Sequence, residues 1–497
     1  MEANKQTLKR VSFSKQKGYS LQDNGDYYFQ GLLHNNLPHG YGKIFSTENQ
    51  NLLFEGDFHS GVYQGKGCIY SELGMKIYEG YFEDNLYHNY GKLFDEFEDI
   101  AYEGTWNHSS RSGQGNSYYE HGCIQYQGSW LNNKQDGYGV LVDEIGNFIY
   151  KGYWKDNLKD GEGSFYEKRI LMYEGSWQFN KKNGFGTLFT INGFKEYEGQ
   201  WDQDIRQGKG IYYYNDGKIQ FKGSFIKGKK EGFCESYYST GQSEFIGRYK
   251  DGKKEGYCRI YTRNGAIVYG GYFKNDLKHG KGIKYNPNGH IEYAGEWVND
   301  MMEDEGVIYH ENGTKKYHGF LRNGVYSING IIFNSFGKIY YFGGFSNGKK
   351  SGRGILYDRE GKNITYKGSW ADDKKEGFGL LYNKGILNYK GMLKNDLSDG
   401  KGLLFYNNGH KSYKGEFKLG YKEGNGVEYY DDGSMKYRGQ WSRNERSGIG
   451  SLYCDDRYLL YDGEWKNGKK DGCGKLYSKQ GDCIRDGVWR NDETSKI

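Results

Sequence analysis

The sequence contains only two prolines in 497 residues and no apolar run long enough to span a membrane. A membrane-spanning helix needs about 20 mostly apolar residues, so the sequence predicts none. Seven cysteines are scattered along the chain, and residues 1–20 are basic without an apolar segment. We therefore expect no secretory signal, and we interpret the cysteines as reduced thiols of an intracellular protein.

Net charge and aliphatic side chains are also in short supply. The formal charge is only +5, from 69 basic and 64 acidic residues. Proteins that bind nucleic acid concentrate basic residues on one face, so we expect no nucleic-acid partner. Aromatic residues make up 18% of the chain and all hydrophobic residues 35%, while glycine contributes 79 residues. Aromatic side chains must therefore form much of the core. Disordered segments are usually rich in proline as well as glycine, so the abundant glycine of this chain does not indicate disorder.

A short pattern, aromatic-x-Gly-x-aromatic, recurs twenty times at intervals of 23 to 25 residues. With its glycine numbered zero, all ten tryptophans stand at +2. A second glycine stands at +9 in sixteen of the nineteen complete repeats, a third at +11 in seventeen, and an aromatic residue at +14 in eighteen. Such regularity predicts one supersecondary unit repeated along the chain. The zero positions are Gly31, Gly56, Gly80, Gly104, Gly128, Gly152, Gly175, Gly199, Gly223, Gly247, Gly271, Gly295, Gly319, Gly343, Gly368, Gly391, Gly415, Gly439, Gly463 and Gly487.

The pattern within each repeat predicts a β-hairpin. Positions −2, zero and +2 share one face of an extended strand, because side chains alternate with a period of two. Polar turn residues follow between +4 and +8, and a second strand runs from +9 to about +15. Two strands joined by a short turn form an antiparallel hairpin, so the fold class is all-β.

The exceptions at the repeated glycines indicate what each glycine does. Asn89, Asp304 and Ile328 replace glycine at +9. Asparagine and aspartate tolerate a left-handed backbone, so +9 is expected to need a positive φ, which isoleucine does not easily adopt. Cys234 and Cys258 replace glycine at +11. We expect the limit there to be volume, with a neighbouring ring lying across the glycine and the two cysteines acting as small fillers.

The repeat resembles the MORN family, as residues 461–477 illustrate with the sequence YDGEWKNGKKDGCGKLY. The resemblance extends over residues 29–489. It implies an elongated single layer of antiparallel hairpins, joined edge to edge into a twisted rod with an aromatic groove. The tryptophans expected to line that groove and to contact a partner are Trp106, Trp130, Trp154, Trp177, Trp201, Trp297, Trp370, Trp441 and Trp465.

The repeat pattern also predicts the domain organisation. Residues 1–26 form a basic, flexible N-terminal arm, residues 27–489 a continuous array of about twenty 24-residue MORN repeats, and residues 490–497 a short tail. The segment 301–330 is irregular, since it contains MMEDE and then Ile328 at a glycine position. Two interpretations stay open there: a local bend or partner-docking segment, or merely a drifted repeat.

Paired lysines at one loop position are the strongest candidate for a binding surface. They are expected to line one edge of the sheet, where they could attract an anionic membrane surface or an acidic polymer such as a microtubule. Acidic residues at +8 beside them favour the alternative of a neutralised, solvated edge. The pairs are Lys181 and Lys182, Lys229 and Lys230, Lys253 and Lys254, Lys349 and Lys350, Lys374 and Lys375, and Lys469 and Lys470.

Residues for catalysis or metal binding are not evident in the sequence. The segment from Gly61 to Gly67 lacks the spacing of a nucleotide-binding loop. The eleven histidines show no ligand spacing, and no acidic pair stands in a context that would bury it. We therefore expect no enzyme, no cofactor, no metal and no small-molecule substrate.

The MORN resemblance implies a function in assembly. Members of the family serve as scaffolds in cilia and flagella, including radial spokes, in the cytoskeleton and at membrane junctions, and as accessory arrays of phosphoinositide kinases. We expect a non-enzymatic scaffold that positions other proteins in a ciliary, flagellar (axonemal) or related cytoskeletal assembly. The alternatives are a membrane-associated adaptor that binds phosphoinositides through its basic loops, or a regulatory partner of a lipid kinase.

Overall fold

The computed structural model describes residues 22–23, 27–454 and 458–494. Every regular element in these residues is a β-strand, and no helix among them is long and apolar enough to cross a membrane. The chain divides into two compact units, Met1–Ser243 and Glu244–Ile497. Most of the predicted flexible arm lies outside the described residues.

The strands of the first unit are short and follow one another closely. They are β1 (Gln22–Asp23), β2 (Tyr27–His34), β3 (Leu37–Ser46), β4 (Leu52–His59), β5 (Val62–Tyr70), β6 (Lys76–Glu83), β7 (Leu86–Phe94), β8 (Ile100–Asn107), β9 (Ser110–Tyr118), β10 (Ile124–Leu131), β11 (Lys134–Val142), β12 (Phe148–Lys155), β13 (Leu158–Glu167), β14 (Ile170–Gln178), β15 (Lys181–Phe189), β16 (Lys195–Asp202), β17 (Ile205–Tyr213), β18 (Ile219–Ile226) and β19 (Lys229–Tyr237).

The second unit continues the same alternation, with β20 beginning at the boundary residue. Its strands are β20 (Ser243–Lys250), β21 (Lys253–Tyr261), β22 (Ile267–Lys274), β23 (Leu277–Tyr285), β24 (Ile291–Val298), β25 (Met301–Tyr309), β26 (Lys315–Arg322), β27 (Val325–Phe333), β28 (Ile339–Ser346), β29 (Lys349–Tyr357), β30 (Ile364–Ala371), β31 (Lys374–Asn383), β32 (Ile386–Lys394), β33 (Leu397–Phe405), β34 (Lys411–Lys418), β35 (Tyr421–Tyr429), β36 (Met435–Ser442), β37 (Glu445–Cys454), β38 (Tyr458–Lys466), β39 (Lys469–Tyr477), β40 (Cys483–Arg490) and β41 (Glu493–Thr494).

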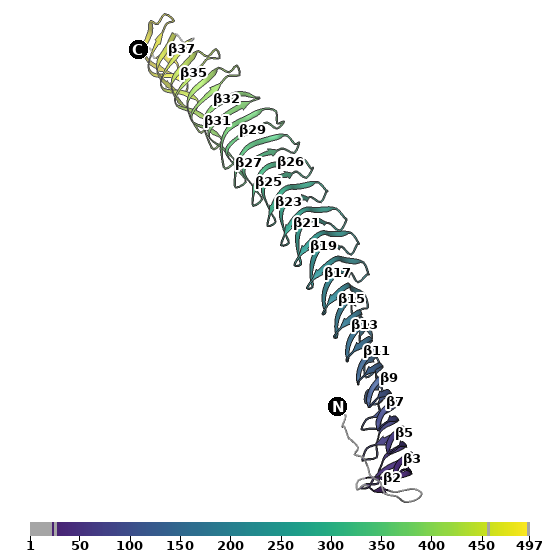
Figure 1. Ribbon diagram of the computed structural model, residues 1–497. Coiled ribbons are helices and arrows are strands. Elements are labelled where there is room, and N and C mark those ends of the chain that lie inside the picture. The colour runs from purple at the N-terminus through teal and green to yellow at the C-terminus, as the bar shows by residue number, and fades with distance from the viewer. Residues whose placement is uncertain (1–21, 24–26, 455–457, 495–497) are drawn as a thin grey trace. The chain divides into compact units, whose positions relative to one another are not determined.

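Among the described residues of each unit, a strand pairs only with the strands before and after it in the sequence, and every pair is antiparallel, as β10 with β9 and with β11. Figure 1 shows the hairpins of each unit following one another in chain order. The predicted fold class, an all-β antiparallel hairpin array in a single layer, is confirmed. At the end of the second unit β41 pairs with β40, so that part of the predicted tail adds a further strand.

The turns and bulges of each hairpin follow from residues with a positive φ. The turn between β12 and β13 places Asp156 at φ 51° and Asn157 at φ 69°. Two successive left-handed residues form a type I′ turn, whose twist matches that of the strands. Glycine at +9 is left-handed as well, for example Gly137 at φ 100°, and the register shifts between Gly128 and Trp130 on the facing strand. The result is a bulge in the hairpin of every complete repeat.

All three residues that replace glycine at +9 adopt the left-handed conformation. Asn89 lies at φ 57° and Asp304 at φ 53°, as the sequence predicts. Ile328 lies at φ 59°, so the expectation that isoleucine would avoid this conformation is wrong. The hairpin bulge is common to every repeat, and it holds the branched residue in a strained backbone region.

The core of each unit is a row of alternating rings. The ring at −2 lies across the bare glycines of its own hairpin: a Cβ on Gly139 would lie 2.1 Å from Oη of Tyr126. The indole at +2 packs edge-on against the rings of two repeats, and Trp130 lies 5.2 Å from Tyr126 and 5.5 Å from Tyr102 between ring centroids. The predicted steric limit at +11 is therefore confirmed, and the rings join each hairpin to the next.

The segment 301–330 keeps the hairpin pattern. Strands β25, β26 and β27 pair in antiparallel fashion, with Gly306 facing Gly319 and Gly319 facing Gly330. A partner-docking role for this segment stays a prediction.

Candidate interaction surfaces

The two lysines of each predicted pair have different surroundings. Both follow the tight turn at the start of a strand. The first lysine is exposed in all six pairs, namely Lys181, Lys229, Lys253, Lys349, Lys374 and Lys469. The second is half-buried in all six, namely Lys182, Lys230, Lys254, Lys350, Lys375 and Lys470.

The second lysine clamps one repeat to the next. The ammonium of Lys350 lies 5.6 Å from the ring centroid of Tyr341 and 5.1 Å from that of Trp370 in the following repeat. Its backbone N–H donates to Oδ1 of Asp373 at 2.9 Å, and Asp373 N–H donates to the carbonyl oxygen of Lys350 at 3.1 Å. This lysine therefore serves the fold, through cation–π contacts and a reciprocal backbone bond.

The acidic residue at +8 also links one repeat to the next. Oε2 of Glu376 accepts a hydrogen bond from the backbone N–H of Asn395 at 3.0 Å, in the turn of the next repeat. Oδ2 of Asp471 accepts one from Asn491 in the same way at 3.3 Å. The tight turns at the start of these strands form one edge of the sheet, which we call the loop edge. Only the first lysine of each pair extends from it, and Nζ of Lys349 lies 3.5 Å from Oδ1 of Asp372. The loop edge is therefore a mixed-charge surface with one exposed lysine at each of these six turns.

The predicted groove tryptophans lie in the core. Trp106 is 4% exposed and Trp177 is 7% exposed, and the other seven fall within this range. The indole N–H of Trp465 donates to the carbonyl oxygen of Gly450 at 2.8 Å. Burial also raises the pKa of the tyrosines beside the indoles, to about 12 for Tyr197 and Tyr461. Contact between a partner and these indoles stays a prediction that their buried positions do not favour.

Exposed aromatic rings form a regular row on the other face of the first unit. They stand at +10, on alternate second strands of the hairpins, in the first, third, fifth, seventh and ninth repeats. The four intervening +10 residues are polar: Lys66, Gln114, Glu162 and Lys209. We call the five rings the outer aromatic row: Tyr41, Tyr90, Tyr138, Phe185 and Phe233, which are 48% to 58% exposed.

The spacing of the outer aromatic row follows from the strand order. Consecutive members are separated by four strands, and at about 4.8 Å per strand the rings lie about 19 Å apart. The rings at +10 point away from the core because the adjacent glycine at +11 faces the core ring at −2 and side chains alternate along a strand. Large exposed aromatic residues are enriched at the centres of protein interfaces.

Cys234 and Cys258 behave as the sequence predicts. Both are free thiols and fully buried. The Sγ of each occupies the space above the central glycine of its repeat, Gly223 or Gly247. Burial raises the pKa of both thiols, so they are poor nucleophiles.

The hairpins recur every 23 to 25 residues and share one core motif and one turn type. These features define a tandem β-hairpin repeat protein. The chain matches the MORN repeat over most of its length, and it belongs to the MORN-repeat family. The matched residues are 29–47, 54–72, 78–95, 126–148, 150–166, 173–193, 197–219, 221–243, 245–267, 269–291, 293–315, 341–362, 366–385, 389–411, 413–435, 437–457 and 461–483. Arrays of this family are structural repeats that serve as scaffolds or mediate protein interactions.

Other comparisons add little. No curated protein sequence matches the chain. The chain is similar to a solved TcdB2-TccC3-Cdc42 structure at 10% identity, over 91% of this chain and 28% of that chain, with a TM-score of 0.13. The chain is also similar to a Tc holotoxin pore of Photorhabdus luminescens at 9% identity, over 95% of this chain and 29% of that chain, with a TM-score of 0.13. This chain spans less than a third of those chains, and similarities this weak support no conclusion about its fold or function.

Two groups of surface residues were not found from the sequence alone. The outer aromatic row could have been found, because its members recur every second repeat at one position. The second group is Glu83, His88 and His108, which come from different positions of two repeats. Only the pairing of hairpins brings those three side chains together.

Proposed function

We propose that this protein is a non-enzymatic scaffold that holds other proteins at fixed spacing in a ciliary, flagellar or related cytoskeletal assembly inside the cell. The outer aromatic row carries the proposal. Five exposed rings recur every second repeat, and each is 48% to 58% exposed on a strand of a regular sheet. A partner that contacts one ring can bind again about 19 Å further along the first unit.

The rigidity of the array supports a scaffold. Many turns are held to the preceding repeat by a reciprocal pair of backbone and side-chain hydrogen bonds, as between Lys182 and Asp204, at 2.9 and 3.0 Å. Where the second turn residue is glycine, as at Gly348, the backbone bond remains. Most core rings also contact a ring of the following repeat, as Tyr173 does with Trp201 at 5.9 Å. Surfaces supported in this way keep their spacing, which a flexible linker would not.

The experiment compares tagged chains in ciliated cells. In one variant, Tyr90→Ser, Tyr138→Ser and Phe185→Ser remove three rings of the row. In the control, Gln114→Ser and Lys209→Ser change the same strand position in intervening repeats. We expect wild type and control to remain in the axonemal fraction after detergent extraction, and the triple variant to be released. Equal retention of all three chains would refute a role for the row, and a chain confined to the plasma membrane would refute the cytoskeletal assignment.

A membrane-associated adaptor is the second candidate, favoured by the exposed lysine at six turns of the loop edge. Its test is sedimentation with vesicles that contain phosphoinositides. If the loop edge binds lipid, substituting the exposed lysines Lys181, Lys253 and Lys349 with glutamine will abolish a salt-sensitive association. The matched control substitutes one acidic +8 residue, Glu376→Gln, which would not weaken binding to an anionic surface. Sedimentation that is insensitive to salt and to the lysine substitutions would exclude this candidate.

A further inference from the structure

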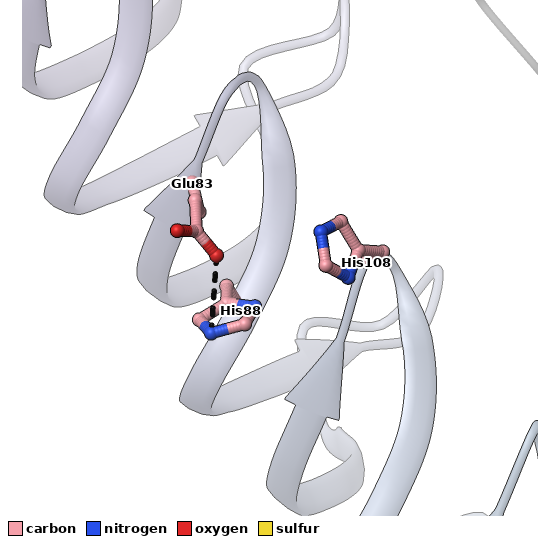
Figure 2. A group of neighbouring side chains, drawn as sticks. All are labelled: Glu83, His88 and His108. Atoms are coloured by element: carbon pink, nitrogen blue, oxygen red, sulfur yellow. Dashed lines mark ion pairs between the residues drawn. The ribbon is translucent and has the colours of Figure 1, made fainter.

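Glu83, His88 and His108 converge across two neighbouring hairpins of the first unit. Glu83 ends strand β6, His88 lies in β7, and His108 lies in the turn between β8 and β9, as Figure 2 shows. One ligand atom from each residue lies within 4.8 Å of the other two. Oε2 of Glu83 is 3.2 Å from Nε2 of His88. Glu83 and His88 are half-buried and His108 is exposed, so the group is open to solvent on one side.

Backbone hydrogen bonds hold the two histidines in place. The N–H of Ser109 donates to the carbonyl oxygen of Tyr87 at 2.8 Å, and the N–H of Tyr87 donates to Oγ of Ser109 at 3.0 Å. Tyr87 precedes His88 and Ser109 follows His108 in the sequence. The distance between the two histidine backbones is therefore set by a bonded pair directly beside them, so the backbone of the site is in place before any ligand arrives.

The histidine nitrogens are suited to bind a cation. Nδ1 of His108 lies 2.7 Å from Oδ1 of Asn107. A proton donated from Nδ1 to this acceptor leaves the lone pair of Nε2 free, which is the usual support for a metal-bound histidine. Nδ1 of His88 is buried without a hydrogen-bond partner, so Nε2, which faces Glu83 at 3.2 Å, is the nitrogen that can reach an ion. Two neutral imidazoles and a carboxylate are a ligand set that zinc accepts, with a fourth position left for water.

We propose that Glu83, His88 and His108 form a binding site for a divalent transition metal ion of the zinc type. Zinc binds nitrogen and oxygen ligands at about 2.0 to 2.2 Å, so that tetrahedral ligand atoms lie about 3.3 Å apart. Glu83 and His88 already have this separation. A side-chain rotation of the exposed His108 closes the remaining gap. The bound ion links the β6–β7 hairpin to the β8–β9 turn, and its fourth position accepts water or a side chain from a partner protein.

The chain contains a matched control for this site. His279 stands at the same +8 position as His88, and its Nδ1 is also buried without a partner. The residues equivalent to Glu83 and His108 in its repeats are Lys274 and Asn299, neither of which offers a zinc ligand of this kind. His279→Gln therefore changes the same structural position without changing the proposed site.

The experiment measures zinc binding by the full chain after chelator treatment and exchange into metal-free buffer. Calorimetry with zinc compares wild type, Glu83→Gln, His88→Gln, His108→Gln and His279→Gln. Cobalt replaces zinc in a parallel titration, because its visible absorption reports tetrahedral coordination. Hydrogen exchange with and without zinc measures the protection of the amides of Tyr87 and Ser109.

We expect one more strong zinc equivalent in wild type and His279→Gln than in the three site variants. Each site substitution should weaken that equivalent at least about 10-fold, since even second-sphere changes cost 10- to 100-fold in affinity. Zinc should slow exchange at Tyr87 and Ser109 only in chains with an intact site. Identical titrations for all five chains, or zinc binding without protection at these amides, would overturn the proposal. His108→Gln keeps the test decisive if His88→Gln misfolds, because His108 is exposed.

Discussion

The close contact between the ring at −2 and the residue at +11 predicts how much stability is lost when Gly282 is replaced. A Cβ at this position would lie 2.1 Å from Oη of Tyr269 and 2.6 Å from Cζ. Tyr269 is only 1% exposed, so its ring has no free space to enter. Gly282→Cys should therefore destabilise this region by about 1 to 3 kcal/mol, the usual cost of overpacking.

The chain itself shows how this cost is avoided. The two repeats with cysteine at +11 have phenylalanine at −2, Phe221 with Cys234 and Phe245 with Cys258. Every repeat with tyrosine at −2 keeps glycine at +11. The atom nearest to the missing Cβ of Gly282 is the tyrosine hydroxyl oxygen. Its removal relieves the closest contact, and a small shift of the phenylalanine ring must then accommodate the thiol, because Cζ at 2.6 Å would still be too near.

The prediction is tested as a double-mutant cycle. Tyr269→Phe alone loses the hydrogen bond from Oη to the carbonyl oxygen of Tyr272, 3.3 Å long, at a cost of about 0.5 to 1.5 kcal/mol. Adding Gly282→Cys to Tyr269→Phe should cost little more. We expect a coupling energy of at least about 1 kcal/mol, since the two residues are in contact.

Hydrogen exchange of the amides in β22 and β23 is the assay, because repeat arrays open locally and need not unfold in a single step. Gly270→Ala is the control. Its Cβ would meet nothing closer than 3.5 Å, so alanine should stabilise the strand by about 0.5 to 1 kcal/mol. Additive costs for Gly282→Cys and Tyr269→Phe would refute the proposed steric relation between ring and glycine.

Three further predictions concern the backbone, the turns and pH. Ile328→Asn should stabilise β27 by about 1 kcal/mol in hydrogen exchange, because asparagine tolerates a left-handed φ and Ile328 is 61% exposed; slower opening of the wild-type strand would contradict this. Asp373→Ala should accelerate hydrogen exchange at the amide of Lys350, because this N–H loses a charged acceptor and local stability falls by about 1 to 3 kcal/mol. Unchanged exchange would show that this hydrogen bond does not hold the two turns together. Burial raises the pKa of Tyr197 and Tyr461 to about 12 in the folded chain, from about 10 when unfolded. Their neutral forms therefore add stability that is complete below pH 10 and lost as the pH rises toward 12. Circular dichroism should show loss of the strand signal in that range, and a strand signal that is unchanged up to pH 12 would contradict the prediction.

Much of the fold could be predicted from the sequence, because the physical causes are local. A glycine at +9 and a polar pair in the turn determine the hairpin whatever lies further away. The steric limit at +11 was visible from Cys234 and Cys258, two small residues at equivalent positions. Ile328 was the exception, since the bonded bulge imposes a conformation that the residue alone would avoid.

The candidate surfaces were harder to predict, because they depend on contacts between neighbouring repeats. Alternation along a strand shows which residues share a face, but not which face is enclosed. Trp106 and the other indoles were therefore expected at a groove, although rings of two repeats enclose them. The lysine pairs were expected to act alike, but Lys350 covers two rings and Lys349 does not. The group at His88 could not be predicted, because its members hold three different repeat positions.

In the part of the chain that the structure describes, each strand of a unit pairs only with its sequence neighbours, and this has a consequence for synthesis of the chain. A hairpin can form as soon as its own residues leave the ribosome, and it then offers its edge and its ring to the next one. Growth of the sheet can thus keep pace with translation, because none of the strands that the structure describes depends on a partner far away in the sequence. Gain or loss of a whole 24-residue repeat by recombination would leave the register of its neighbours intact.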